Sequence, residues 1–253
     1  MKAILSIWAW TVIGLTVIFG FITLVLLSPT MIFDRNRRIV GRAFRLSSVV
    51  AAKLIPQWRF RRVGELHRPR GRTVVVGNHL SLADPFLVSS LPWEMKWMAK
   101  EEAFSLPLMG WSMRLAGDIP VNRADRVSGK AALERARFWL ERGMPVMMFP
   151  EGTRSKTHEM LPFKPGAFRL AIETGADVLP IAICGTDKAL PKHGWKMSRT
   201  TARVITSEPI STAGMTVDDV PALSEQVRER IQGLLEELGQ YREAPAGHPV
   251  RAS

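Results

Sequence analysis

The sequence contains a single cysteine, Cys184, among its 253 residues. One thiol cannot form an intramolecular disulfide, and it excludes a zinc site built on several thiolates. We expect Cys184 to be a small core residue, so nothing in the sequence requires an oxidising compartment. The five histidines are scattered and lack metal-ligand spacing, which predicts neither a metal nor a bound cofactor. A hydrophobic content of 46% excludes a disordered chain.

Charged side chains are absent from residues 3–33, and residues 4–27 are almost wholly apolar. A run of this length suffices to cross a bilayer, which needs about 20 residues. A cleaved signal peptide fits less well, because only Lys2 precedes the run, the run is too long and no A-x-A-type cleavage site follows it. We expect residues 1–33 to form an uncleaved transmembrane or membrane-embedded helix.

Acidic residues are scarce in the segment that follows. Residues 34–72 hold twelve Lys and Arg against two Asp and Glu, so this segment supplies most of the net charge of +12. A nucleic-acid-binding protein would carry such charge on its folded module. Basic residues directly after a membrane helix instead favour the cytoplasmic side and attract anionic lipids, at about 1 kcal/mol per residue. We therefore predict a membrane-bound protein with its folded domain on the cytoplasmic face and no nucleic-acid partner.

The rest of the sequence divides into three segments, residues 34–72, 73–241 and 242–253, which differ in their hydrophobic patterns. Apolar residues recur at helical spacing within residues 39–55, so the basic segment 34–72 is expected to include an amphipathic helix at the membrane interface. Residues 73–241 are long enough for one domain with its own core. Residues 242–253 are expected to form a flexible tail.

Short β-branched runs alternate with helical patterns after residue 73. Strands are expected at 73–77, 96–99, 118–122, 146–149, 178–183 and 202–206. Helices are expected at 128–141, 165–174 and 217–238. This alternation predicts an α/β fold, in which a central mixed or largely parallel sheet is flanked by helices and carries an N-terminal membrane-anchoring helical arm.

A polar cluster follows the expected strand 73–77, in residues 78–84 (NHLSLAD). On an uninterrupted helix the side chains of His79 and Asp84 would diverge by about 140°, so a loop-to-helix transition is needed to bring them together. Ser81 with Asp84 resembles a capping box, and Pro85 suits the first turn of a helix. His79 could then act as a base oriented by Asp84. A helix cap beside a structural histidine is an equally acceptable interpretation.

Two further clusters follow later strands. Residues 149–155 (FPEGTRS) are expected to form a tight turn in which Gly152 lets backbone N–H groups approach a ligand. Arg154 can present planar donors to a phosphate or carboxylate there. Residues 117–123 (GDIPVNR) end another strand with Arg123. Taken singly, these patterns are also typical of a surface turn and an exposed arginine.

In this order and at these separations, NHLSLAD, GDIPVNR and FPEGTRS resemble the first three motifs of the glycerolipid acyltransferases, the family typified by bacterial 1-acyl-sn-glycerol-3-phosphate acyltransferase. Further matching segments are residues 99–104 (AKEEAF), 107–111 (PLMGW), 163–168 (FKPGAF) and 178–182 (VLPIA). The resemblance covers residues 73–210.

The resemblance implies a fatty acyl transfer that needs no nucleophile from the enzyme. The acyl group would pass from acyl-CoA or acyl carrier protein to the sn-2 hydroxyl of lysophosphatidic acid, giving phosphatidic acid for phospholipid biosynthesis in the membrane. His79 would be the general base and Asp84 would hold its imidazole. The implied acceptor-side residues are Arg123 and Arg154 for the phosphate, Lys100 beside them, Glu151, Gly152 and Thr153 for the shape of the pocket, and Asn78 and Ser81 in support of the His79–Asp84 pair.

Other classes of protein are less consistent with the sequence. A serine hydrolase needs a G-x-S-x-G turn, which is absent, and the sequence has no P-loop. A metal-dependent hydrolase would need a third ligand at a recognisable spacing. Acylation of another lysophospholipid or of a lipoamino acid stays open, as does a non-enzymatic lipid-binding protein.

Overall fold

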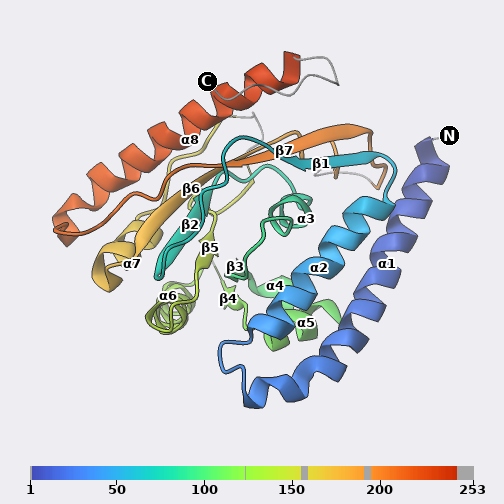
Figure 1. The fold of residues 1–253 in the computed structure, drawn as a ribbon, viewed down its shortest axis with the longest axis horizontal. Helices are drawn as coiled ribbons and strands as arrows, with labels where there is room; N and C mark the ends of the chain where they lie inside the picture. The colour runs from blue at the N-terminus through green and yellow to red at the C-terminus, as the bar shows by residue number, and fades with distance from the viewer. Residues whose placement is uncertain (1, 123, 155–158, 191–194, 244–253) are drawn as a thin grey trace.

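A seven-stranded sheet lies at the centre of the computed structural model, which describes residues 2–122, 124–154, 159–190 and 195–243 (Figure 1). The described strands are β1 (Trp58–Arg62), β2 (Thr73–Gly77), β3 (Lys96–Lys100), β4 (Ile119–Val121), β5 (Val146–Met148), β6 (Asp177–Cys184) and β7 (Thr200–Thr206). Their order across the sheet is β1-β7-β6-β2-β5-β3-β4. β7 runs antiparallel to β6, and the other described neighbours pair in parallel.

Helices cover both faces of the sheet. The described helices are α1 (Lys2–Leu27), α2 (Arg38–Leu54), α3 (Asp84–Val88), α4 (Glu101–Phe104), α5 (Met109–Ala116), α6 (Arg126–Glu141), α7 (Gly166–Thr174) and α8 (Val220–Glu243), with the 3-10 turns η1 (Ser28–Ile32) and η2 (Val217–Asp219). α6, α7 and α8 pack against Val74 and Val76 of β2, whereas α3 and the loop after it pack against Val75. β2 is therefore a central strand buried on both faces, as its continuous apolar sequence indicates. The predicted fold class is confirmed.

Some elements are not indicated by the sequence pattern. β1 has the sequence WRFRR and pairs with β7 at the edge of the sheet. The arginines of β1 are exposed, as is common for an edge strand. The composition of this strand therefore resembles that of a solvated basic segment, and the sequence pattern does not indicate a strand. The helices α4 and α5 also lack a clear signal, whereas the helix expected within residues 39–55 is present as α2. Most of the expected tail, residues 242–253, lies outside the described residues.

The arm, which comprises α1, η1 and α2, packs against the domain along much of its length. Near one end of α1, Nε1 of Trp10 donates to the carbonyl oxygen of Trp195 at 2.9 Å. Further along, the ring of Phe21 lies 5.6 Å from that of Trp111. α1 and α2 also share a buried apolar cluster with α4 and α5. The arm therefore forms part of the folded unit.

Candidate active site

The clusters in residues 78–84 and 149–154 meet at one edge of the sheet. β2 and β5 are parallel neighbours, and each cluster follows the carboxyl end of its strand. Parallel strands that end side by side bring their loops together, which is where open α/β sheets bind ligands. Topology alone therefore places two of the three candidate clusters next to each other.

His79 and Asp84 form a hydrogen-bonded pair. Nδ1 of His79 lies 2.7 Å from Oδ2 of Asp84, and this oxygen also accepts the backbone N–H groups of Leu80 and Ser81 at 2.8 and 3.1 Å. Because the buried carboxylate acts as an acceptor, we assign the ring proton to Nδ1, which leaves Nε2 with its lone pair. The ring stacks on Phe149 with 4.2 Å between centroids. The pair has the geometry of an oriented general base.

Asn78 and Ser81 are buried and hold the loop in place. Nδ2 of Asn78 donates to the carbonyl oxygen of Ile183 at 2.9 Å, and its Oδ1 accepts the Ile183 N–H at 2.8 Å. Oγ of Ser81 donates to the carbonyl oxygen of Leu190 at 2.9 Å. Neither side chain lines the cavity beside His79. Their contacts fix the backbone on both sides of the histidine.

Glu151 connects the two clusters. Its Oε1 accepts the His79 N–H at 2.8 Å, and its Oε2 accepts the Leu161 N–H at 3.0 Å. Burial raises the pKa of the Glu151 carboxyl, and the two N–H donors act in the opposite direction. Glu151 is not among the residues that line the cavity. Glu151 therefore fixes the backbone position of His79 and does not face the cavity.

A cavity of about 630 Å³ opens beside His79, and most of its walls are apolar. The lining residues include Trp97, Met98, Phe149, Gly152, Thr153 and Arg154 from the domain, and Trp10, Ile13 and Phe44 from the arm. A cavity of this size and composition suits a ligand with a long apolar portion and a polar end. Within the described residues, no group of His, Cys, Asp and Glu could hold a metal ion.

The candidate phosphate-binding residues differ in their surroundings. Arg154 is half-buried in the cavity wall and forms no ion pair with any described residue. Lys100 also lines the cavity, but its side chain is 61% exposed and pairs with Glu102 at 2.6 Å. Arg123 lies outside the described residues. Arg154 is thus the described cation best placed to meet an anionic ligand.

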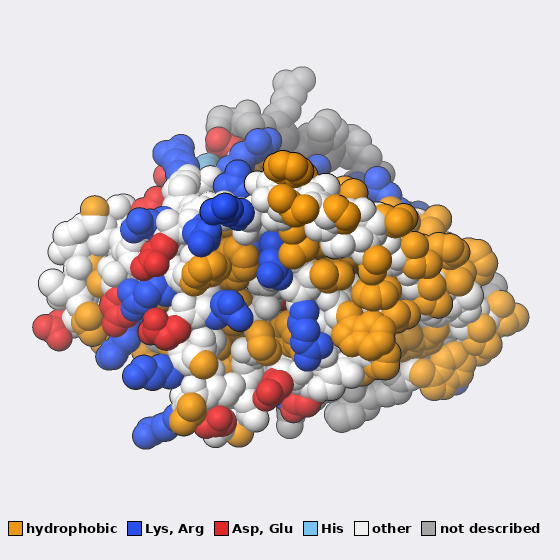
Figure 2. All heavy atoms as spheres, turned by 90° about the horizontal axis from the view of Figure 1, so that it is seen from below, with side chains coloured by type: hydrophobic (Ala, Val, Ile, Leu, Met, Phe, Trp, Pro, Cys, Tyr) orange, Lys and Arg blue, Asp and Glu red, His pale blue; other side chains and the backbone are white. Residues whose placement is uncertain are grey.

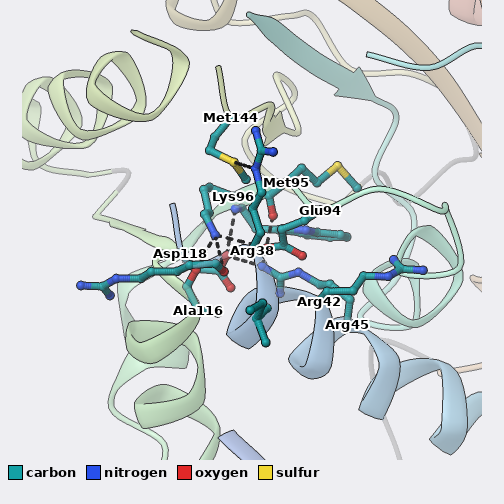
Figure 3. Close-up of polar contacts among 12 residues, drawn as sticks. Arg38, Arg42, Arg45, Glu94, Met95, Lys96, Ala116, Asp118 and Met144 are labelled. Carbon is teal, nitrogen blue, oxygen red and sulfur yellow. Dashed lines mark hydrogen bonds and ion pairs between the residues drawn. The ribbon is translucent and has the colours of Figure 1, made fainter. Parts of the chain in front are cut away.

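Another part of the cavity wall is formed by a buried ion pair between Arg45 of α2 and Asp118. Next to this pair, the fully buried ammonium of Lys96 lies 3.4 Å from Glu94 (Figure 3). Burial raises the pKa of Glu94 to about 7, although Arg45 and Lys96 act against the shift. The cluster links the arm to the domain through charges that are removed from water.

Glu94 is expected to make stability depend on pH. Its folded pKa of about 7 exceeds the ordinary value of 4.5, so its contribution to stability is fully present below about pH 4.5 and is lost as the pH rises toward 7. The free energy of unfolding should fall by about 3 kcal/mol over this range through Glu94 alone. Urea unfolding in detergent at pH 5 and pH 7 should give a smaller loss for Glu94→Gln than for the wild type. Exposed Glu229→Gln should keep the wild-type loss, and an equal loss in Glu94→Gln would contradict the assignment.

Sequence reasoning missed several residues of this site. Phe149 could have been suspected, because it directly follows β5 and precedes the PEGTR segment, and β5 neighbours β2. Trp10 and Phe44 carry no such signal, since a helical pattern gives the buried face of a helix but not its partner. Their place in the cavity wall follows only from the packing of the arm.

The site lies in a segment that is shared with known proteins. Residues 59–184 match the family model described as Acyltransferase. The chain is 36% identical over 174 residues to a 1-acyl-sn-glycerol-3-phosphate acyltransferase of Chlamydomonas reinhardtii, with 68% of this chain and 52% of that protein covered. It is 32% identical over 203 residues to a chloroplastic 1-acyl-sn-glycerol-3-phosphate acyltransferase of Arabidopsis thaliana, with 79% and 57% covered. The chain thus spans about half the length of these curated relatives.

A solved structure extends the similarity to the arm. The crystal structure of the 1-acyl-sn-glycerophosphate acyltransferase PlsC from Thermotoga maritima matches with a TM-score of 0.78 and 25% identity, and all of both chains is covered. The similarity therefore includes the N-terminal helices as well as the sheet and its loops. On these grounds, the chain belongs to the acyltransferase family.

Proposed function

We propose that the protein is a membrane-bound 1-acylglycerol-3-phosphate acyltransferase, which moves a fatty acyl group from acyl-CoA or acyl carrier protein to the sn-2 hydroxyl of lysophosphatidic acid. The observation that carries this proposal is the His79–Asp84 pair beside a largely apolar cavity whose wall includes Arg154, a cation that forms no ion pair with the described residues. The names of the curated relatives support the same substrate class. The product is phosphatidic acid.

His79 supplies base catalysis in this reaction. Its Nε2 takes the proton of the acceptor hydroxyl while the hydroxyl oxygen attacks the thioester carbonyl. An oxygen–carbon bond forms, the carbon–sulfur bond breaks, and the imidazolium returns the proton to the leaving thiolate. Asp84 stabilises the imidazolium between these steps. A thioester is already activated, so base catalysis worth about 10²–10⁴ in rate, together with positioning, replaces an enzyme nucleophile.

Arg154 is proposed to bind the acceptor phosphate with its planar set of donors. Arg123 and Lys100 are proposed as further cations on the acceptor side, and Gly152 and Thr153 shape the wall between the phosphate and His79. The residues proposed to position these groups without facing the ligand are Asn78, Ser81 and Glu151.

The arm is proposed to hold the site at the membrane surface. α1 is long and apolar enough to cross a bilayer by length and composition. Figure 2 shows hydrophobic side chains gathered over one end of the molecule, with Lys and Arg side chains beside them. Exposed apolar side chains of α1 include Phe19 at 63% and Leu26 at 73%. Because α1 also contacts the domain at Trp10 and Phe21, we infer that it lies in the membrane alongside the domain, with the basic segment on the cytoplasmic face.

The double substitution of Phe19→Asp and Leu26→Asp should release the protein from membranes. Each exposed apolar side chain contributes roughly 1.5–3 kcal/mol when it is buried in lipid, and a carboxylate there is strongly unfavourable. Sedimentation with vesicles measures the bound fraction. Val217→Asp changes an exposed apolar residue of η2 and should leave that fraction unaltered. Unaltered binding of the double variant would count against the proposed membrane face.

The proposed activity is tested with the purified full chain in detergent. Lysophosphatidate, glycerol-3-phosphate, other lysophospholipids and a lipoamino acid are each offered with acyl-CoA and with acylated carrier protein, and release of free thiol is the readout. The highest kcat/KM is expected with lysophosphatidate. Preference for another acceptor would replace the proposed substrate, and lipid binding without thiol release from any pair would indicate a non-enzymatic protein.

A further inference from the structure

Lys164 lies against the turn that carries Arg154. Its backbone N–H donates to the carbonyl oxygen of Pro150 at 2.9 Å. A Cβ atom at position 152 would lie 2.9 Å from Cε and 3.0 Å from Nζ of Lys164. Gly152 also has a φ of 70°, in the left-handed region that favours glycine. The glycine thus leaves the space in which the Lys164 ammonium approaches the turn.

A second cavity of about 270 Å³ lies on the Lys164 side of this turn. It shares three lining residues with the larger cavity, namely Met98, Phe149 and Gly152. Lys164 lines the smaller cavity and Arg154 lines the larger one. These three shared residues form a partition between the two cavities, and the two cations lie on opposite sides of it.

No described carboxylate forms an ion pair with either of these two cations, Lys164 and Arg154. Both oxygens of Glu151 accept backbone N–H groups. Asp125 lines the smaller cavity, but its oxygens accept the N–H groups of two residues in the first turn of α6. Within the described residues, both cations beside Gly152 are thus left without a direct carboxylate partner.

We propose that Lys164 is a specificity-determining residue, which selects acceptors with a phosphate monoester over those with a phosphodiester. This inference rests on the proposed function. A phosphate monoester carries about −1.5 to −2 charges at pH 7, whereas a phosphodiester carries one. Arg154 with its planar donors can bind either group. The compact ammonium of Lys164, on the other side of Gly152, meets the second charge that only the monoester presents.

The test measures kcat/KM of the full chain with one acyl-CoA and two acceptors, lysophosphatidate and lysophosphatidylglycerol, at equal fractions in mixed micelles. Lys164→Met should lower kcat/KM for lysophosphatidate about ten-fold through KM, because one positive charge near the phosphate is lost; a ten-fold change corresponds to about 1.4 kcal/mol. The value for lysophosphatidylglycerol should stay within about two-fold of the wild type, so the preference collapses. Lys164→Arg, which keeps the positive charge, should retain most of the preference for lysophosphatidate. Lys130→Met, an exposed substitution on α6 outside both cavities, is the matched control and should change neither value.

The pH dependence of the Lys164→Met deficit distinguishes charge recognition from a structural role, because a structural role would give the same deficit at every pH. The second pKa of a phosphate monoester is about 6, so the monoester loses its second charge as the pH falls below this value. The deficit of Lys164→Met relative to wild type should therefore shrink as the pH falls from 7.5 to 5.5.

Three results with Lys164→Met would overturn the proposal. An equal loss with both acceptors would make Lys164 a general cation, and wild-type values in Lys164→Met would leave it without a role. A deficit that is the same at both pH values would exclude recognition of the second charge. The proposed function is judged separately, on the wild type, because a wild-type enzyme that does not use lysophosphatidate would overturn both.

Discussion

His79→Ala is expected to lower kcat for acyl transfer by about 10²–10⁴-fold, the range that general base catalysis supplies. Nδ1 of His79 lies 2.7 Å from Oδ2 of Asp84 and the ring lines the cavity, so its removal takes away the group proposed to accept the hydroxyl proton. KM for the acceptor should change little, since other side chains are proposed to hold the phosphate. Initial rates of thiol release with saturating acceptor measure the effect.

Stability separates this loss from unfolding. Without the His79 ring, Oδ2 of Asp84 still accepts the N–H groups of Leu80 and Ser81, so the truncation should leave the melting temperature within a few degrees of the wild type. His67→Ala removes a histidine that does not line the cavity, and it should keep full activity. Asp84→Asn should also impair kcat, because an amide in place of the carboxylate no longer stabilises the imidazolium. Full activity of His79→Ala would remove the residue from the mechanism.

Arg45→Met is expected to destabilise the protein by about 3–5 kcal/mol, the cost of leaving a buried charge unpaired. The Arg45 and Asp118 side chains are 7% and 1% exposed, and Asp118 would lose its cationic partner. Urea unfolding in detergent at constant pH measures the loss. Arg35→Met removes an exposed arginine of the same basic segment and should cost less than about 1 kcal/mol.

A double variant separates lost charge pairing from lost packing. Adding Asp118→Asn to Arg45→Met removes the unpaired charge while it keeps an oxygen for the Trp97 N–H, which now donates to Asp118 at 3.0 Å. The double variant should recover a large part of the lost stability. If it is as unstable as Arg45→Met, packing of the arginine stem on its aromatic neighbours explains the effect instead.

The sequence predicts the approach of His79 to Asp84 because both partners lie within one short segment whose turn residues are recognisable. Ser81 and the early Pro85 indicate a turn followed by a helix, and His79 contacts Asp84 across that turn. The predicted capping box does not form, because Oγ of Ser81 accepts the Ala83 N–H and the N-cap of α3 is Ala83. Likewise, the apolar run of β2 predicts a central strand, and the strand is buried on both faces. Local chemistry determines these features, so they are visible without the fold.

Contacts between distant segments could not be predicted in this way. Glu151 bonds to the backbone of His79, 72 positions away, and no side-chain type signals a backbone partner. Trp10 and Phe44 reach the cavity only because the arm folds back over the domain. The strand β1 could not be predicted from its exposed arginines, because its pairing with β7 is made by main-chain hydrogen bonds and does not depend on its side chains.

The wall that the arm contributes to the larger cavity has a consequence for any attempt to produce a water-soluble fragment. Trp10, Ile13 and Phe44 line the same cavity as His79, so a version without residues 2–55 would keep His79 and Asp84 but lose one side of the cavity. Under the proposed function, attachment to lipid and shelter for the hydrocarbon chain are thus two uses of the same helices. Truncation cannot remove the first without also removing the second.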